Sequence, residues 1–155
     1  MRAASAIYLI RNGYGILMDC ADGSYNQLFD HFGHKSMVDK AIIKTKFAFI
    51  THVHGDHQLG ILKILSERDK LLTKNDIRYK NKIYVCAPST LMEWLNLFVK
   101  DSLEYPDMVV LVPSMNLNPE NHYYYQPNTV NINKWKEHYG DFRTAMPRCP
   151  LRTYE

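Results

Sequence analysis

The sequence predicts an α/β fold, and two observations support that prediction. Short apolar runs alternate with stretches of helical spacing over residues 6–112, a pattern typical of a sheet covered by helices. The chain has 155 residues, of which 46% are hydrophobic, so it can form a domain with a core and is not a disordered chain. We expect an α/β segment over residues 1–112, continued in the same domain by a polar tail over residues 113–155 that is rich in Tyr, Asn and Pro.

Five short runs are rich in β-branched or aromatic residues and are predicted to be strands. Asn12 and Gly13 separate the first two runs, and Asn-Gly favours a two-residue hairpin turn. The third run is apolar at almost every position, which suits a strand buried on both faces. The predicted strands are residues 6–10, 14–19, 46–50, 83–87 and 108–112.

Four stretches have apolar residues at helical spacing. Asp22 or Ser24 is expected to cap the first of these helices, and Gly33 is expected to end it. Ser89 is expected to cap the last, and residues 73–82 are polar enough to form a linker. The predicted helices cover residues 25–32, 37–43, 59–70 and 92–99.

Charge and cysteine content narrow the class of protein. A net charge of +3 and a pI of about 8.7 permit an anionic partner without demanding one. Cys20, Cys86 and Cys149 form an odd set without CxxC spacing, so a reducing, intracellular location is expected. Cytoplasm, nucleus and mitochondrion remain open. No apolar stretch is long enough to span a bilayer, and no membrane association is expected.

The segment His52-x-His54-x-Asp56-His57 carries the chemistry. Four side chains that can bind metal fall within six residues, between a predicted buried strand and a helix, where α/β sheets bind ligands. Imidazole nitrogen and carboxylate oxygen are ligands that zinc accepts. Gly55 is expected to let the backbone turn tightly enough to aim its neighbours in different directions. The segment therefore predicts a metal site.

This segment resembles the HxHxDH signature of the metallo-β-lactamase superfamily. The resemblance implies an αββα sandwich with two metal ions, held by His52 and His54 on one side and by Asp56 and His57 on the other. It also implies hydrolysis, in which the metal ions would lower the pKa of a water and polarise a phosphate. Asp56 would be the catalytic carboxylate that accepts the proton of the nucleophile. Zinc is the expected metal, with manganese or iron as alternatives.

The flanking segments narrow the resemblance to tRNase Z, the endonuclease that removes 3′ trailers from precursor tRNA. Residues 17–28 resemble its "LLDCGEGTxxQL" segment, and residues 2–7 resemble the end of its "KxRNVSSI" loop. Residues 50–61 match "SHLHADHxxGI", and residues 142–144 resemble an "FQT" segment of the long form. The chain is thus similar to the carboxy-terminal half of that form, and precursor tRNA is the expected partner.

Several further residues receive roles through this resemblance. Asp19 or Asp22 is expected to orient the metal-bound histidines as an outer-shell or substrate-binding group, and Arg2 is expected to contact RNA phosphate. Cys149 falls where the third metal-binding histidine of the family should lie, and the later ligands would follow Glu155. We therefore expect the first half of the sandwich, whose partner is the rest of the domain or a second copy, and little activity from the chain alone.

Two alternatives remain open at this point. The chain could be a catalytically incomplete homologue that binds RNA or a protein, as Cys149 and the missing downstream ligands suggest. It could also be another hydrolase of this fold, such as glyoxalase II, although the segment from Asp22 to Gln27 argues against that. Metal content and cleavage of a precursor tRNA separate these hypotheses.

Overall fold

A computed structural model describes residues 5–75 and 81–117 of the chain. The predictions for Arg2, Cys149, residues 142–144 and nearly all of the polar tail lie outside the described residues. They therefore stay predictions.

Five strands form one sheet, in the order in which they occur along the chain. β1 (Ile7–Arg11) and β2 (Tyr14–Met18) form an antiparallel hairpin, and β3 (Thr45–Phe49), β4 (Ile83–Ala87) and β5 (Val109–Pro113) extend it in parallel. Connections between parallel strands are nearly always right-handed. Because the parallel strands are added one after another in the same direction, their connecting helices must fall on the same face.

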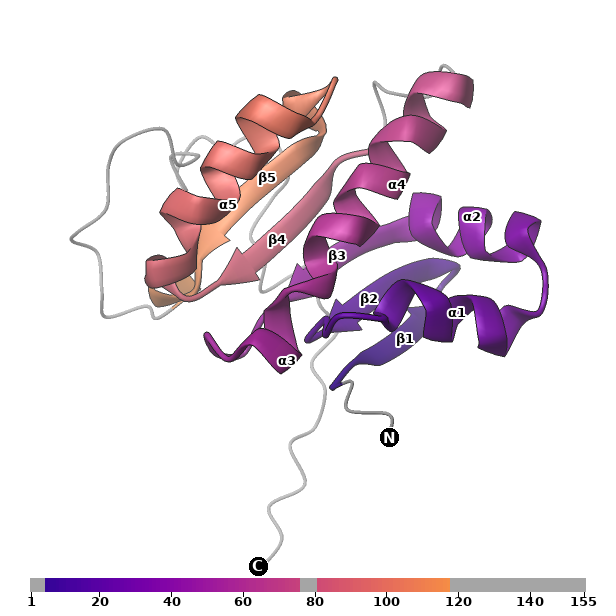
Figure 1. Cartoon of the computed structure of the whole chain (residues 1–155), viewed down its shortest axis with the longest axis horizontal. Helices are drawn as coiled ribbons and strands as arrows, with labels where there is room; N and C mark the ends of the chain where they lie inside the picture. Colours follow the sequence, from indigo (N-terminus) through magenta and orange to yellow (C-terminus); the bar gives the residue numbers. More distant parts are fainter. Residues whose placement is uncertain (1–4, 76–80, 118–155) are drawn as a thin grey trace, which may run out of the picture. The chain divides into compact units, whose positions relative to one another are not determined.

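Figure 1 shows this arrangement, with the helices over one face of the sheet. All five predicted strands and all four predicted helices are present, with ends shifted by a few residues. Among the described helices, none is long and apolar enough to cross a membrane. The helical elements are α1 (Ser24–Phe32), α2 (Lys35–Lys44), α3 (Gly55–Gln58), α4 (Gly60–Asn75), α5 (Ser89–Ser102) and the 3₁₀ turns η2 (Pro106–Met108) and η3 (Ser114–Leu117).

The predicted hairpin turn and the predicted end of the first helix are both confirmed. Asn12 and Gly13 have φ angles of 50° and 78°, the pair of positive values that a type I′ turn requires. Gly33 has a φ angle of 71°, and its N–H donates to the carbonyl of Phe29 at 2.8 Å. Glycine ends helix α1 because a left-handed residue is needed there.

The predicted helix caps are wrong. Gly23, rather than Asp22 or Ser24, occupies the N-cap position of α1, with a φ angle of 86° and no side-chain cap. Ser24 already belongs to the helix. Ser89 is likewise the first residue of α5, following Pro88, and the start of that helix has no side-chain cap. Backbone geometry and the glycine or proline before each helix determine these starts.

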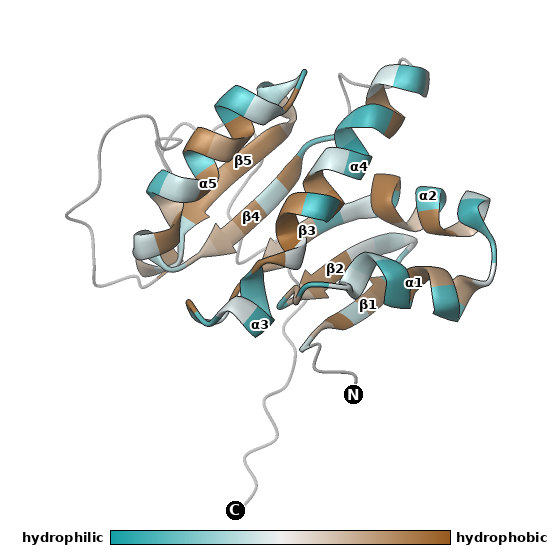
Figure 2. Cartoon of the chain, viewed as in Figure 1, coloured by the Kyte–Doolittle hydropathy of each residue, from teal (hydrophilic) through white to brown (hydrophobic). Residues whose placement is uncertain are grey.

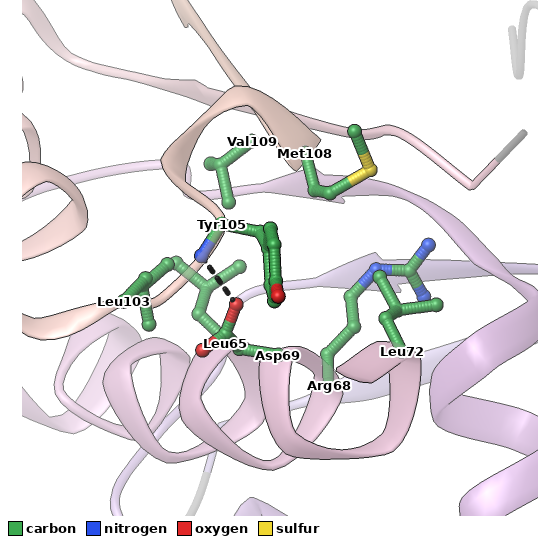
Figure 3. A pocket seen from close by; sticks show the side chains of 8 residues that line it. All are labelled: Leu65, Arg68, Asp69, Leu72, Leu103, Tyr105, Met108 and Val109. Atoms are coloured by element: carbon green, nitrogen blue, oxygen red, sulfur yellow. Dashed lines mark hydrogen bonds between the residues drawn. The ribbon is translucent and has the colours of Figure 1, made fainter. Parts of the chain in front are cut away.

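Helix α4 runs past its predicted end at residue 70, to Asn75. Leu71 and Leu72 are buried. They continue the apolar face of α4 into a stretch whose other residues are polar. The Asp69 carboxylate accepts hydrogen bonds from the backbone N–H groups of Glu104 and Tyr105, at 2.9 and 3.0 Å. Figure 3 shows the bond from Tyr105. The same helix thereby fixes the turn that leads into β5.

The core lies between the helices and the sheet. Leu17, Ala48 and Val85 alternate with residues that point the other way, and each is at most 2% exposed. Figure 2 shows apolar residues along the strands and along the helix surfaces that cover them. The cluster that fills this space is Leu17, Cys20, Leu28, Val38, Ile42, Ala48, Ile50, Ile61, Ile64, Leu65, Leu71, Ile83, Val85, Ala87, Leu91, Met92, Leu95, Val99 and Leu103.

The opposite face of the sheet is apolar as well. Leu9, Ile16, Phe47 and Tyr84 stand in register across four adjacent strands, on the face away from the helices because side chains alternate along a strand. The rings of Phe47 and Tyr84 stack with centroids 5.4 Å apart. A sheet with two apolar faces is typical of a layer inside a sandwich.

Candidate metal centre

The candidate site lies at the carboxyl ends of two neighbouring parallel strands. Asp19 directly follows β2, and the motif at residues 52–57 follows β3. The two strand ends are joined by a hydrogen bond from the Asp19 N–H to the carbonyl of Phe49, at 2.7 Å. Ligands bind α/β sheets at this edge. The position of the histidines there agrees with the sequence prediction.

Asp19 is the centre of a hydrogen-bond network. It has a φ angle of 54°, a left-handed conformation that Asp and Asn adopt more readily than other non-glycine residues. One carboxylate oxygen accepts from the backbone N–H of Thr51 at 2.8 Å, and the other lies 2.9 Å from Nδ1 of His57. The Thr51 hydroxyl is 2.9 Å from both oxygens. Partial burial opposes ionisation of Asp19, but these hydrogen bonds outweigh it and hold the pKa of the carboxyl below its ordinary value.

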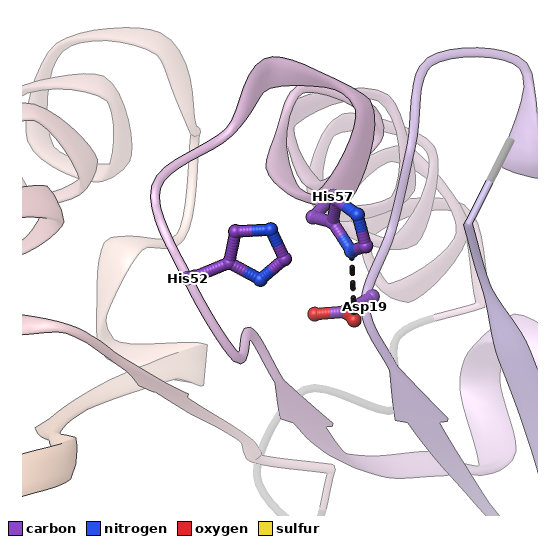
Figure 4. Close-up of side chains that lie close together, drawn as sticks. All are labelled: Asp19, His52 and His57. Carbon is purple, nitrogen blue, oxygen red and sulfur yellow. Dashed lines mark hydrogen bonds and ion pairs between the residues drawn. The ribbon is translucent and has the colours of Figure 1, made fainter. Parts of the chain in front are cut away.

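Two imidazoles meet in front of this carboxylate. The ring centroids of His52 and His57 are 3.9 Å apart, and one ligand atom from each, with one from Asp19, lies within 4.8 Å of the others (Figure 4). A carboxylate only accepts hydrogen bonds, so Nδ1 of His57 carries the hydrogen that it shares with Asp19. The Nε2 lone pair of His57 is then available to a metal ion.

The remaining predicted ligands lie at the margin of this group. The ring of His54 packs edge-on against that of His52, with centroids 4.7 Å apart. Asp56 places a carboxylate oxygen 3.6 Å from Nε2 of His57. Asp22 is exposed, and the structure does not bring its carboxylate into the Asp19 group. Of the two candidate supporting carboxylates, only Asp19 reaches the histidines within the residues that the structure describes.

This donor set fits a zinc ion. Imidazole nitrogens and carboxylate oxygens are normal zinc ligands, and metal-binding histidines usually donate their second N–H to an oxygen. His57 already makes that second hydrogen bond, to Asp19. Because Thr51 and His57 occupy both oxygens of Asp19, the carboxylate is better placed to orient ligands than to be one.

The short helix α3 and the start of α4 bring the motif against the β2–α1 loop. The N–H of Cys20 donates to the carbonyl of His57 at 2.7 Å, and the N–H of Gly60 donates to the carbonyl of Cys20 at 2.8 Å. Gly55 is the first residue of α3 and has no positive φ angle. The predicted reason for Gly55 is therefore wrong. Gly60 is the glycine that the close approach requires, because a Cβ there would overlap the backbone carbonyl of Ala21.

We expect Gly60→Ala to destabilise the chain by about 1–3 kcal/mol, because two backbone segments would have to separate. The strain would also pull His57 from Cys20, so zinc affinity should fall too. Gly55→Ala is the matched control, since its added Cβ would meet only the flexible side chain of Leu59 at 3.3 Å. Thermal unfolding of both variants measures the difference. Equal melting temperatures would contradict the proposed close approach.

Sequence comparison shows which known proteins this chain is similar to. No protein-family model matches the sequence. The chain is 30% identical over 99 residues to zinc phosphodiesterase ELAC protein 2 from Macaca fascicularis, a match that covers 64% of this chain and 12% of the relative. It is 33% identical over 94 residues to the mitochondrial ribonuclease Z 2 of Schizosaccharomyces pombe, covering 61% of this chain and 13% of that protein.

The chain is thus similar in sequence to proteins named zinc phosphodiesterase and ribonuclease Z. A long-form ribonuclease Z from yeast has a similar structure, with a TM-score of 0.59 and 19% sequence identity, covering 85% of this chain and 18% of that one. The expected metallo-β-lactamase-like α/β fold is thereby confirmed, as is the resemblance to tRNase Z. The chain spans about one eighth of the length of the curated relatives it matches, 12% and 13%.

Sequence reasoning missed one polar residue of this site. The sequence assigns Thr51 no role beyond its place in the matched segment, yet its hydroxyl contacts both Asp19 and His52. The available signal was its position, directly between the end of a buried strand and the first histidine of the motif.

Proposed function

We propose that this chain supplies metal-binding residues of a zinc-dependent phosphodiesterase that removes the 3′ trailer from precursor tRNA. The observation that carries the proposal is the convergence of His52, His57 and Asp19 at the carboxyl edge of the sheet. Its relatives are named zinc phosphodiesterase and ribonuclease Z, which supports zinc as the metal and RNA as the substrate. Two relatives are named mitochondrial, which supports an intracellular location.

In this proposal His52 and His54 bind one zinc ion, and Asp56 and His57 bind a second. Bound zinc supplies an acidified water and charge neutralisation at a phosphate. Asp19 would hold the ring of His57 through Nδ1, which would leave the Nε2 lone pair available to bind zinc. Asp56, 59% exposed at its side chain, is accessible to accept the proton of the nucleophile. Manganese or iron would suit the same donors.

Cleavage of a precursor tRNA tests this function. We expect the protein that contains this chain to release the 3′ trailer in the presence of zinc, and His52→Ala to abolish that release. His31→Ala is the control, because His31 lies on α1 and does not belong to the group of possible metal ligands found among the described residues. RNA binding without cleavage, at less than one zinc per chain, would instead favour a catalytically incomplete homologue. Hydrolysis of a thioester such as S-lactoylglutathione would favour a different hydrolase of this fold.

The apolar face of the sheet opposite the helices supports a further layer as partner. We propose that this face packs against the rest of the domain or against a second copy of the chain. The residues 1–155 alone should then elute from a sizing column as more than a monomer, because burying apolar surface favours association. Light scattering of the eluate measures the mass. A monomer that melts sharply would contradict this proposal.

A further inference from the structure

The Thr51 hydroxyl contacts both the Asp19 carboxylate and the ring of His52. Its oxygen is 2.9 Å from each carboxylate oxygen of Asp19 and 2.8 Å from Nδ1 of His52. A hydroxyl carries one hydrogen and can also accept. Only one of its two neighbouring groups can therefore receive the Thr51 hydrogen, and the other must supply a hydrogen of its own.

The chemistry of Asp19 decides the direction of these hydrogen bonds. An ionised carboxylate can only accept a hydrogen bond. The contacts at 2.9 Å between the Thr51 hydroxyl and the Asp19 oxygens must therefore use the hydrogen of Thr51. His52 can carry a hydrogen on either ring nitrogen. Thr51 thus donates to Asp19, and Nδ1 of His52 donates to the Thr51 oxygen.

We propose that Thr51 is a positioning residue that holds His52 in the Nδ1–H tautomer and leaves Nε2 of that ring as the metal ligand. His57 obtains the same tautomer directly from Asp19, at 2.9 Å. The Asp19 carboxylate therefore sets the tautomer of both rings. It acts on His57 by direct contact and on His52 through the Thr51 hydroxyl. The inference rests on the proposed function for the identity of the ion, whereas the tautomer belongs to the metal-free chain.

The backbone around Thr51 is held independently of its hydroxyl. Ile50 is 0% exposed, and its N–H donates to the carbonyl of Cys86 at 2.8 Å. The N–H of Thr51 itself donates to Asp19 at 2.8 Å. Replacing Thr51 by valine preserves its shape and both backbone hydrogen bonds, so the substitution removes the hydroxyl with little other change.

Histidine nitrogen shifts measured by NMR on the metal-free, ¹⁵N-labelled chain test the inference. At a pH where the imidazoles are neutral, we expect the Nδ1–H tautomer at His52 in the wild type and in Thr51→Ser. Thr51→Val should show a mixture of tautomers at His52, with His57 unchanged. Thr51→Ala serves as a second variant without the hydroxyl. Thr73→Val is the control, because the Thr73 hydroxyl donates to the Asp69 carbonyl within α4.

Zinc titration of the same variants provides the second measurement. We expect Thr51→Val to bind zinc about 10- to 100-fold more weakly than the wild type, the usual effect of losing an outer-shell partner, and Thr51→Ser to retain affinity. An unchanged His52 tautomer in Thr51→Val and Thr51→Ala would overturn the inference, whatever their zinc affinity. If the wild type shows the tautomer but binds no zinc, the role of Thr51 stands and the proposed function fails.

Discussion

Asp19→Asn is expected to weaken zinc binding by about 10- to 100-fold, the range seen when the partner of a metal-bound histidine is changed. Asparagine has one acceptor oxygen where aspartate has two, so either Thr51 or His57 loses its hydrogen bond. Asparagine also tolerates the φ angle of 54° at this position, so backbone strain does not contribute. Isothermal titration with zinc measures the change.

Asp22→Asn is the matched control for this experiment. Asp22 is exposed on the same loop, and the group of possible metal ligands found among the described residues contains Asp19 but not Asp22. We expect Asp22→Asn to bind zinc as the wild type does. Equal losses in the two variants would indicate a general effect of negative charge and would contradict the orienting role of Asp19.

Arg68→Met is expected to produce the largest loss of stability. The Arg68 side chain is 1% exposed and donates to the carbonyls of Ile42, Ile43 and Asn81, the last two at 2.8 and 2.6 Å. Ile42 and Ile43 lie in the last turn of α2, where carbonyls have no partner within the helix. One guanidinium therefore joins α2, α4 and the segment that enters β4.

The size of this effect follows from two opposing contributions. Each carbonyl left unsatisfied costs about 1–3 kcal/mol, and removing a buried cation recovers part of that cost. Burial lowers the pKa of Arg68 to about 10, which still leaves the guanidinium charged at neutral pH. We expect the free energy of unfolding to fall by about 3 kcal/mol.

Urea denaturation of Arg68→Met measures this loss, with Arg11→Met as the control because Arg11 is exposed in β1. The control should lie within about 0.5 kcal/mol of the wild type, as surface substitutions usually do. A wild-type midpoint for Arg68→Met would show that the carbonyls of α2 do not depend on the guanidinium.

The order of strands and helices was predictable from the sequence because local signals agree with the fold. The hairpin at Asn12-Gly13 and the helix end at Gly33 depend on positive φ angles that few other residues adopt. The position of the metal motif was predictable too, since a buried strand directly precedes His52.

Contacts between distant segments were not predictable. The hydrogen bonds of Asp19 reach Thr51 and His57, more than thirty residues away, and nothing in the local sequence distinguishes Asp19 from Asp22 as the partner. No local sequence pattern identifies Gly60 as essential, because it is needed only to leave space for the carbonyl of Ala21. Such features become visible only when β2 and β3 lie side by side.

Zinc content after dialysis tests the central claim most directly. The claim is that His52 and His57, oriented by Thr51 and Asp19, each bind zinc through Nε2. We expect the wild-type chain and His31→Ala to retain at least one zinc ion, measured by elemental analysis, and His52→Ala and His57→Ala each to retain less zinc than the wild type. A wild-type chain without zinc, or equal zinc in all four proteins, would contradict the claim.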